Sequence, residues 1–344
     1  MSAAAGSARI AAFADRVLEV LTTPQRRIGS SVLRALLGTA IVLFYLENLG
    51  WRRFLWGPDG VVPLSYAGEL VEKHGPNLYL QSASAAGFEL IFWLGLLSAV
   101  AFACGRWVPF STVACAIFTW CLIARDSFVT DSGWTLATIL LMYAVALDCS
   151  TYLVAGKWFA PPATATDGRN SFVGRARALL HNFGVALVLW QVSLLYAAAC
   201  FYKITGHKWQ DGTALYYILR SNQFNLTPLG AHVYQSAVLV AAATYATLIL
   251  QAAFPFCIWQ RPAKYVVALA AIGFHLGIAY TMALPLFSLV MIACEAMLFS
   301  DDDYRLALSA LRTYAARVAP AQFLRAFVER PAAVTATLPT RGME

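Results

Sequence analysis

The sequence predicts an all-α membrane protein, a polytopic transmembrane bundle of about eight helices. Of the 344 residues, 60% are hydrophobic and only 12% are charged, whereas a soluble domain carries about a quarter charged residues. The mean hydropathy is +0.62. A membrane helix needs about 20 mostly apolar residues, and apolar runs of about this length recur along the chain. No polar block is long enough to form a separate soluble domain.

Eight segments are expected to cross the membrane, although the third and the last are short. They are 30–50, 85–105, 108–124, 134–156, 182–203, 232–258, 264–283 and 285–299. The last two meet at Pro285 and could instead form one long broken helix. Seven or nine spans are the alternatives. No internal repeat is obvious, which argues against the transporter folds that are built from inverted repeats.

Both ends of the chain are expected outside the bundle, on the cytoplasmic side. Residues 1–27 are charged throughout and are expected to form an amphipathic helix on the membrane surface. Residues 28–300 form the transmembrane domain, and residues 301–344 form a cytoplasmic tail. With eight spans, the main groups of arginine and lysine fall on one side, which the positive-inside rule makes cytoplasmic. This predicts a multi-pass protein of the cytoplasmic (inner or plasma) membrane. The outer exceptions are Arg52, Arg53, Lys73, Arg125 and the stretch that contains Lys203.

Ionisable side chains inside a bilayer cost about 2.5–3.5 kcal/mol each on insertion scales, so each one needs a reason. The candidates are Arg34, Glu47, Glu89, Asp148, Lys203, His275 and Glu295. Arg34 is expected to extend to the cytoplasmic headgroups, and Asp148 and Glu295 are expected to be ordinary interfacial carboxylates. Glu47 is expected to reach water, and Glu89 suits the positive end of a helix dipole.

Lys203 and His275 each have a structural and a functional interpretation. His275 lies in the middle of a span, where a lone histidine is more often a satisfied polar contact than a catalyst, and it needs a partner. Lys203 follows an uncharged apolar run. It either reaches the outer interface or points into the bundle, where an uncharged amine can act as a general base.

The remaining composition excludes two kinds of site. The seven cysteines lie in or beside apolar segments without metal-ligand spacing, so they are expected to be small buried hydrophobes, and no metal site is predicted. The basic residues cluster in terminal and loop segments, which is typical of membrane topology and not of nucleic-acid binding.

The stretch "YKITGHKWQDGTALYYIL" resembles the signature of the horizontally transferred transmembrane (HTTM) domain, the family of vitamin K-dependent γ-carboxylase membrane domains. That signature is an aromatic residue, a lysine, a short spacer and Trp-x-x-Gly, here Tyr202, Lys203, Trp209 and Gly212. Three other stretches are similar to family segments: "SVLRALLGTAIVLFYL", "LWGPDGVVPL" and "FHLGIAYTMALPLFSLVMI". Together they cover about residues 28–300. A bacterial subset of the family resembles sporulation-delaying protein B, which is needed to mature a secreted peptide toxin.

The resemblance implies a quinone-dependent chemistry. In the carboxylases, the lysine of this motif is proposed to deprotonate a vitamin K hydroquinone, after which oxygen yields a strong base, a glutamate loses its γ-proton and carbon dioxide adds. Carried over, Lys203 and His275 are the catalytic residues, with Lys203 as the base and His275 against the quinone or an oxyanion. The substrate pocket is then expected to include Tyr202, His207, Trp209, Asp211, Gly212 and Tyr216.

Three departures from the family bear on carboxylation itself. The spacer between Lys203 and Trp209 is one residue longer than in the animal enzymes, and Gly133 stands near the place of a family histidine. A counterpart of the large lumenal domain of the animal enzymes is also not expected here.

The sequence therefore predicts a membrane enzyme with an outward-facing pocket, which performs quinone-coupled chemistry, of a carboxylase-like or oxidoreductase-like kind, or modifies or matures an exported peptide. The expected cofactor is a vitamin K-like quinone or hydroquinone. The expected partners are membrane lipid and either an exported peptide or a partner membrane protein. The alternatives are a non-catalytic membrane module that binds lipid or peptide and supports a partner, and a transporter.

Overall fold

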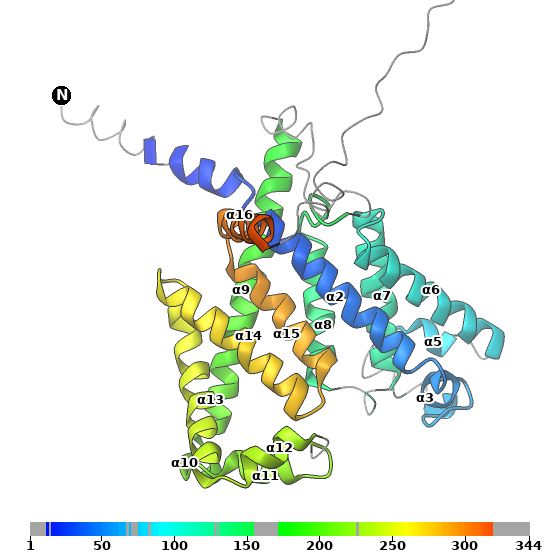
Figure 1. The fold of residues 1–344 in the computed structure, drawn as a ribbon. Helices are drawn as coiled ribbons and strands as arrows, with labels where there is room; N and C mark the ends of the chain where they lie inside the picture. Colours follow the sequence, from blue (N-terminus) through cyan, green and yellow to red (C-terminus); the bar gives the residue numbers. More distant parts are fainter. Residues whose placement is uncertain are drawn as a thin grey trace, which may run out of the picture. The chain divides into compact units, whose positions relative to one another are not determined.

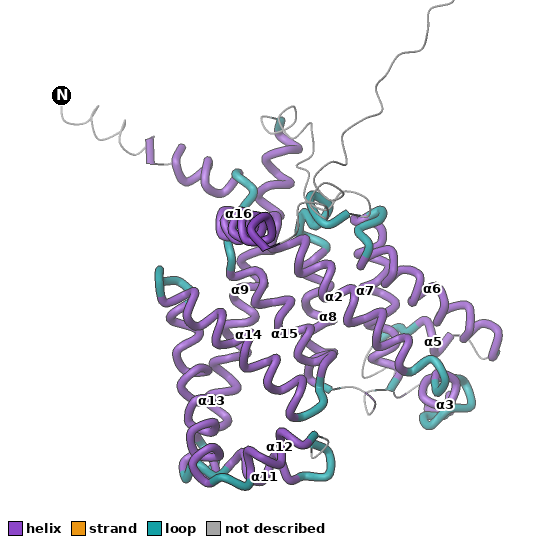
Figure 2. The backbone as a smooth tube through the Cα atoms, viewed as in Figure 1, coloured by secondary structure: helices purple, strands orange, loops and turns teal. Residues whose placement is uncertain are grey.

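The computed structural model describes residues 12–13, 15–66, 69, 75–81, 84–126, 129, 131–154, 171–224 and 227–318. In these residues the regular structure is helical and no strand is present (Figure 2). The chain divides into two compact units, Met1–Asp301 and Asp302–Glu344, and each is described by itself. Residues 1–11 and 14 of the expected N-terminal surface helix and residues 319–344 of the expected tail lie outside the described residues, and residues 15–22 are helical.

Six helical segments of the first unit are long and apolar enough to cross a membrane, which indicates a membrane-embedded protein. They are Asp15–Glu47, which contains α2 (Arg27–Glu47), and α6 (Ala85–Ala103), α7 (Val108–Arg125), α9 (Phe172–Ile204), α13 (Ala237–Cys257) and α14 (Ala263–Thr281). Two shorter apolar helices accompany them, α8 (Ser132–Ala144) and α15 (Pro285–Glu295), and the 3-10 turn η3 (Ala296–Leu298) continues α15.

These eight helices run alternately in opposite directions between two ends of the first unit (Figure 1). The end where α2 and α9 begin is called here the Arg27 end, and the end where they finish is called the Lys203 end. Helix α2 packs between α6 and α15, while α9 packs against α8, α13 and α15. The short elements of the Lys203 end are α3 (Arg52–Trp56), η1 (Leu64–Tyr66), α5 (Leu78–Gln81), α10 (His207–Gln210), α11 (Ala214–Arg220) and α12 (Pro228–Tyr234).

Capping residues explain where several helices begin. The hydroxyl oxygens of Ser84, Ser171 and Ser236 accept hydrogen bonds from backbone N–H groups in the first turns of α6, α9 and α13. The Ser171 cap starts α9 ten residues before the expected start at 182. The expected helix over 232–258 is divided into α12 and α13 at the Ser236 cap.

The sequence left open whether the last two spans are separate helices or one long helix broken at Pro285. Helices α14 and α15 pack against each other and run in opposite directions, so they are separate helices and not one long broken helix (Figure 1). Residues 282–284 are not helical, and Pro285 occupies the first turn of α15. Proline suits that position because the first turn leaves its N–H groups without intrahelical partners.

The guanidinium group of Arg34 is fully buried and does not extend to the headgroups, so the sequence-based expectation for this residue is wrong. Its five N–H groups donate to five main-chain carbonyls. These are Phe102 at 2.7 Å, Ala103 at 2.6 Å, Cys149 at 3.0 Å, Leu153 at 2.6 Å and Tyr152 at 3.4 Å. The first two belong to the last turn of α6, where carbonyls lack intrahelical partners and the helix dipole is negative.

The same contacts explain why α8 is shorter than predicted. The sequence predicts a helix over 134–156, but α8 ends at Ala144. The chain beyond it forms a loop whose carbonyls face Arg34 in place of the next helical turn. Because a charged side chain can satisfy several orphan carbonyls at once, a non-helical segment is tolerated at this depth of the bundle.

The last residue of the first unit closes the bundle onto its first helix. The carboxylate of Asp301 accepts hydrogen bonds from the backbone N–H groups of Ile28 at 2.7 Å and Arg27 at 3.1 Å. Arg26, at the cap position of α2, has a left-handed backbone and provides no side-chain cap. Asp301 therefore supplies the carboxylate that the start of α2 favours.

Helix α16 (Asp301–Val318) accounts for the described part of the second unit, a helix that the sequence analysis did not predict. Asp302 and Arg305 form an exposed ion pair at 2.9 Å, one helical turn apart. Such exposed pairs contribute about 0.3–0.5 kcal/mol.

Arg34→Met is predicted to destabilise the protein by about 3 kcal/mol or more, because each buried carbonyl that loses its partner costs about 1–3 kcal/mol. Thermal unfolding in detergent micelles measures this. Arg106→Met is the matched control, since Arg106 is exposed at the same end of the bundle, and its change should stay within about 0.5 kcal/mol. Equal stability of the two variants would contradict the assignment.

Candidate functional site

Three polar side chains meet in the apolar interior of the first unit: Tyr196 of α9, His275 of α14 and Glu295 of α15. The hydroxyl group of Tyr196 donates to Oε1 of Glu295 at 2.7 Å and lies 3.0 Å from Nε2 of His275. Nε2 and Oε1 are 3.3 Å apart. Each of the three residues is at most 2% exposed. We call them the buried network; His275 has the partners that the sequence analysis required.

Aromatic side chains surround the buried network. The ring of Tyr196 stacks on Phe254 of α13 at 3.8 Å between centroids. The ring of His275 contacts Phe274 and Phe287 edge-on, at 5.1 and 5.8 Å. In surroundings this apolar, a lone carboxylate or imidazole would be costly, so the three groups satisfy one another.

Two atoms of the buried network lack a hydrogen-bond partner among the described residues, Nδ1 of His275 and Oε2 of Glu295. If Tyr196 donates to Glu295, its oxygen accepts the Nε2 hydrogen, and Nδ1 then carries a lone pair. The hydroxyl of Ser288, two turns before Glu295 on the same face of α15, is also unpartnered within the part of the chain described. Buried polar atoms are nearly always hydrogen-bonded, so these three atoms are available to a polar ligand group or a water molecule. Similar atoms occur elsewhere in the described part of the chain, for example in Trp56 and Arg125.

A line of polar residues follows the contact between α9 and α13 from the buried network to the Lys203 end. The stacking of Tyr196 on Phe254 and the 3.8 Å contact of the Cys200 thiol with the Leu248 carbonyl fix which residues of the two antiparallel helices face each other. We call this line the α9–α13 seam. It consists of Tyr196, Cys200 and Lys203 on α9 and the buried Thr244, Thr247 and Gln251 on α13.

Lys203 lies at the far end of the α9–α13 seam. It is seven residues after Tyr196, which places it two turns and about 10 Å along the same face of α9. Its side chain is half-buried, and Nζ lies 3.5 Å from the carbonyl of Ala199 and 5.4 Å from the ring centre of Trp209. Among the described contacts, none joins Lys203 directly to His275. A group that bridges the two must span the seam.

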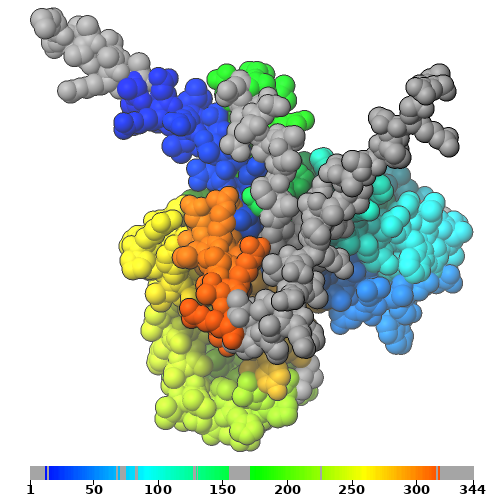
Figure 3. Space-filling view, turned by 45° about the horizontal axis from the view of Figure 1, so that its top comes forward, coloured from blue at the N-terminus to red at the C-terminus, as the bar shows by residue number. Residues whose placement is uncertain are grey.

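The other residues of the expected pocket are spread over the surface of the Lys203 end. Gly212 is buried, Trp209 and Tyr216 are half-buried, and Tyr202, His207 and Asp211 are exposed, Tyr202 to 76%. In Figure 3 the yellow-green surface of this segment is continuous with that of α13, against which α11 and α12 pack. Lys203 and Trp209 are in contact, and Tyr202 faces away from the seam.

Gly212 has a structural reason to be glycine. Its φ angle is +71°, and an added Cβ would lie 2.9 Å from the ring of Tyr245. The hydroxyl of Tyr245 in turn donates to the carbonyl of Gln210 at 2.8 Å. The turn that carries Trp209 is therefore held against α13 at the level of Lys203.

Glu47 is exposed, whereas Glu89 and Arg125 have structural partners within the protein. Glu89 pairs with Arg52 at 3.0 Å and with Arg53 at 2.5 Å. Arg125 is fully buried and donates to the carbonyls of Gly57 and Val62. Three of the basic residues expected on the outer side are thus engaged within the protein. Among the described residues, no group of three His, Cys, Asp or Glu side chains could hold a metal ion.

The structure corrects the expectation for Glu295 and adds Tyr196. The side chain of Glu295 is 0% exposed and belongs to the buried network. The prediction of an interfacial carboxylate is therefore wrong. Tyr196 was missed because a tyrosine in an apolar run is unremarkable by composition. A carboxylate inside "SLVMIACEAMLF" was the available signal for Glu295.

No family model, curated protein or solved structure matches this chain. A functional proposal therefore rests on the sequence motifs and on the geometry of the buried network and the α9–α13 seam.

Tyr196→Phe is predicted to lower stability by about 1–3 kcal/mol, because it removes the hydroxyl between His275 and Glu295 and leaves both buried groups short of a partner. Thermal unfolding in detergent tests this. Tyr202→Phe removes the same atom from an exposed ring and is expected to change stability by less than about 0.5 kcal/mol. If Tyr196→Phe is as stable as Tyr202→Phe, the network does not contribute as described.

Proposed function

We propose that this chain is an integral membrane enzyme of the HTTM type that removes a proton from a lipid-soluble hydroquinone. In this proposal Lys203 is the general base, and the buried network holds the far side of the quinone headgroup. The observation that carries the proposal is the buried network with its two unpartnered atoms, Nδ1 of His275 and Oε2 of Glu295.

The donor and acceptor atoms fit a hydroquinone. A phenolic hydroxyl both donates and accepts hydrogen bonds, and a neutral imidazole nitrogen and a carboxyl oxygen are suitable partners. A para-hydroquinone carries its two oxygens on opposite sides of the ring. With a hydrogen bond of about 2.8 Å at each oxygen, it spans roughly 10 Å. This matches the separation of about 10 Å along α9 between Lys203 and Tyr196.

The position of Lys203 supports its role as the base. An amine that is half-buried between Trp209 and the Ala199 carbonyl is less hydrated than a free surface lysine. Desolvation favours the uncharged amine, which is the form that accepts a proton. A substrate with an apolar tail would reach the seam from the bilayer, since α13 and α14 carry many exposed apolar side chains.

The distribution of basic residues supports the orientation that we propose, with eight spans in the cytoplasmic membrane and the Arg27 end inside. At that end lie Arg27, Arg106, Arg177 and Arg261. At the Lys203 end, Glu89 neutralises part of the charge of Arg52 and Arg53. By the positive-inside rule, this distribution supports a cytoplasmic Arg27 end and an outer Lys203 end.

The test is the oxidation of a short-chain naphthohydroquinone by oxygen, followed with an oxygen electrode in the presence of the purified protein. Lys203→Ala is predicted to lower the protein-dependent rate at saturating hydroquinone by about 100-fold or more, because general base catalysis contributes about 10²–10⁴. Lys208→Ala is the matched control, since Lys208 packs on the ring of Tyr217 away from the seam, and it should retain the rate.

Binding of the naphthohydroquinone is measured separately for the same proteins. Lys203→Ala should still bind it, while His275→Gln should bind it more weakly. A wild-type protein that binds the hydroquinone without accelerating its oxidation would favour the non-catalytic membrane module. A protein that does neither, or equal rates for Lys203→Ala and Lys208→Ala, would overturn the proposal.

A further inference from the structure

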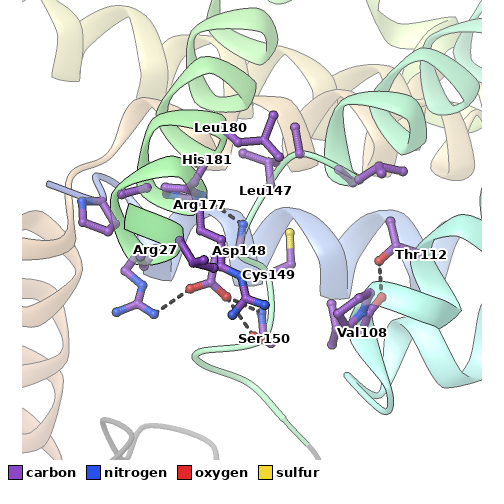
Figure 4. Close-up of a pocket in the computed structure, with 18 of the residues that line it drawn as sticks. Arg27, Val108, Thr112, Leu147, Asp148, Cys149, Ser150, Arg177, Leu180 and His181 are labelled. Carbon is purple, nitrogen blue, oxygen red and sulfur yellow. Dashed lines mark hydrogen bonds and ion pairs between the residues drawn. The ribbon is translucent and has the colours of Figure 1, made fainter. Parts of the chain in front are cut away.

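A cavity of about 650 Å³ lies at the Arg27 end (Figure 4), far from Lys203. Arg177 in its wall is 26 residues before Lys203 on α9, a distance of about 40 Å along the helix. The cavity lies between the beginnings of α2, α7 and α9 and the loop that follows α8. Its apolar wall includes Val108, Pro109, Val145, Leu147 and Leu180, and its polar rim includes Arg27, Asp148, Ser150, Arg177 and His181.

Asp148 and Arg27 neutralise each other inside this rim. The Asp148 carboxylate accepts hydrogen bonds from Arg27 at 2.6 Å, the Ser150 hydroxyl at 2.8 Å and the Thr151 hydroxyl at 3.1 Å (Figure 4). Burial acts to raise the pKa of Asp148, but the bonds to Ser150 and Arg27 and the charge of Arg27 outweigh it and hold the pKa below its ordinary value. Asp148 therefore stays ionised at neutral pH.

Both ring nitrogens of His181 are also engaged. Nδ1 accepts a hydrogen bond from the backbone N–H of Asp148 at 2.9 Å, and Nε2 lies 2.6 Å from the carbonyl of Gln25, to which it donates. This pair of bonds requires the neutral imidazole, because Nδ1 must keep its lone pair. His181 thus shapes the cavity without adding charge.

With Arg27 and Asp148 paired and His181 neutral, the guanidinium group of Arg177 is the charge at the rim that these contacts leave unneutralised. Its side chain is exposed at the rim, and within the described residues it has no acidic partner. The rim therefore carries one net positive charge above an apolar wall. Arginine binds phosphate oxygens through two parallel hydrogen bonds, so this position suits a phosphate group.

We propose that this cavity binds an anionic phospholipid, with the phosphate on Arg177 and part of an acyl chain along Val108 and Leu180. The pairing of a cationic rim with an apolar wall matches an amphiphilic ligand. A free phosphate would use only the rim. The cavity opens where membrane-length helices begin, which is the depth of lipid headgroups. Basic pockets between membrane helices bind lipid headgroups in the same way.

The experiment compares lipid binding to the detergent-purified full chain by native mass spectrometry and by the shift in melting temperature. The probes are dioleoylphosphatidylglycerol, dioleoylphosphatidylcholine and glycerol 3-phosphate. Phosphatidylglycerol should bind and raise the melting temperature, while the other two should not. Arg177→Gln should weaken phosphatidylglycerol binding about fivefold, the loss expected for one arginine near a membrane surface.

Arg106→Gln is the matched control, because Arg106 is exposed at the same end but does not line the cavity, and it should bind as the wild type does. Leu180→Trp leaves Arg177 in place but narrows the apolar wall, and it should also weaken binding. If Arg177→Gln and Arg106→Gln weaken phosphatidylglycerol binding equally, the binding depends on unspecific surface charge and not on the cavity. Equal shifts from glycerol 3-phosphate and phosphatidylglycerol would show a phosphate site without a lipid. Either result would overturn the proposal, as would the absence of any effect of phosphatidylglycerol.

Discussion

The hydroxyl group of Tyr196 ties together three helices, because a polar group in an apolar bundle must find its partner inside the protein. It contacts His275 on α14 and Glu295 on α15, and its ring stacks on α13. These contacts fix how the four helices are rotated about their axes. Once α9 is fixed in this way, the face that carries Tyr196 also carries Lys203, and the α9–α13 seam follows from that geometry.

The same requirement shapes the Arg27 end of the bundle with different chemistry. There the groups to be satisfied are main-chain carbonyls and N–H groups at helix ends, and Arg34 and Asp301 satisfy them. Arg34 allows α6 to end and the chain after α8 to leave the helix, and the cavity of the Arg27 end is bounded by that same loop. Polar residues inside this protein thus determine where its helices stop and where its cavity can form.

Features that depend on neighbouring residues could be predicted from the sequence, whereas features that depend on contacts between distant residues could not. Apolar runs and capping serines are local, and so the positions of most helices could be predicted. The end of α8 depends on Arg34, which is more than 100 residues away along the chain. Composition also could not show that Tyr196 and Glu295, 99 residues apart, face each other. The apolar helices are hydrophobic on every side, so their periodicity does not indicate which faces meet.

The proposed function requires a substrate headgroup at Nδ1 of His275, the ring nitrogen that has no hydrogen-bond partner among the described residues. The ¹⁵N signals of the histidine side chains in the labelled protein test this directly, with the His275 signals identified by their loss in His275→Gln. Adding the naphthohydroquinone under anaerobic conditions is predicted to shift the Nδ1 signal of His275 and to leave that of His181 unchanged. If the His275 signals stay unchanged while the hydroquinone is bound, the buried network is a structural element and not the site of the chemistry.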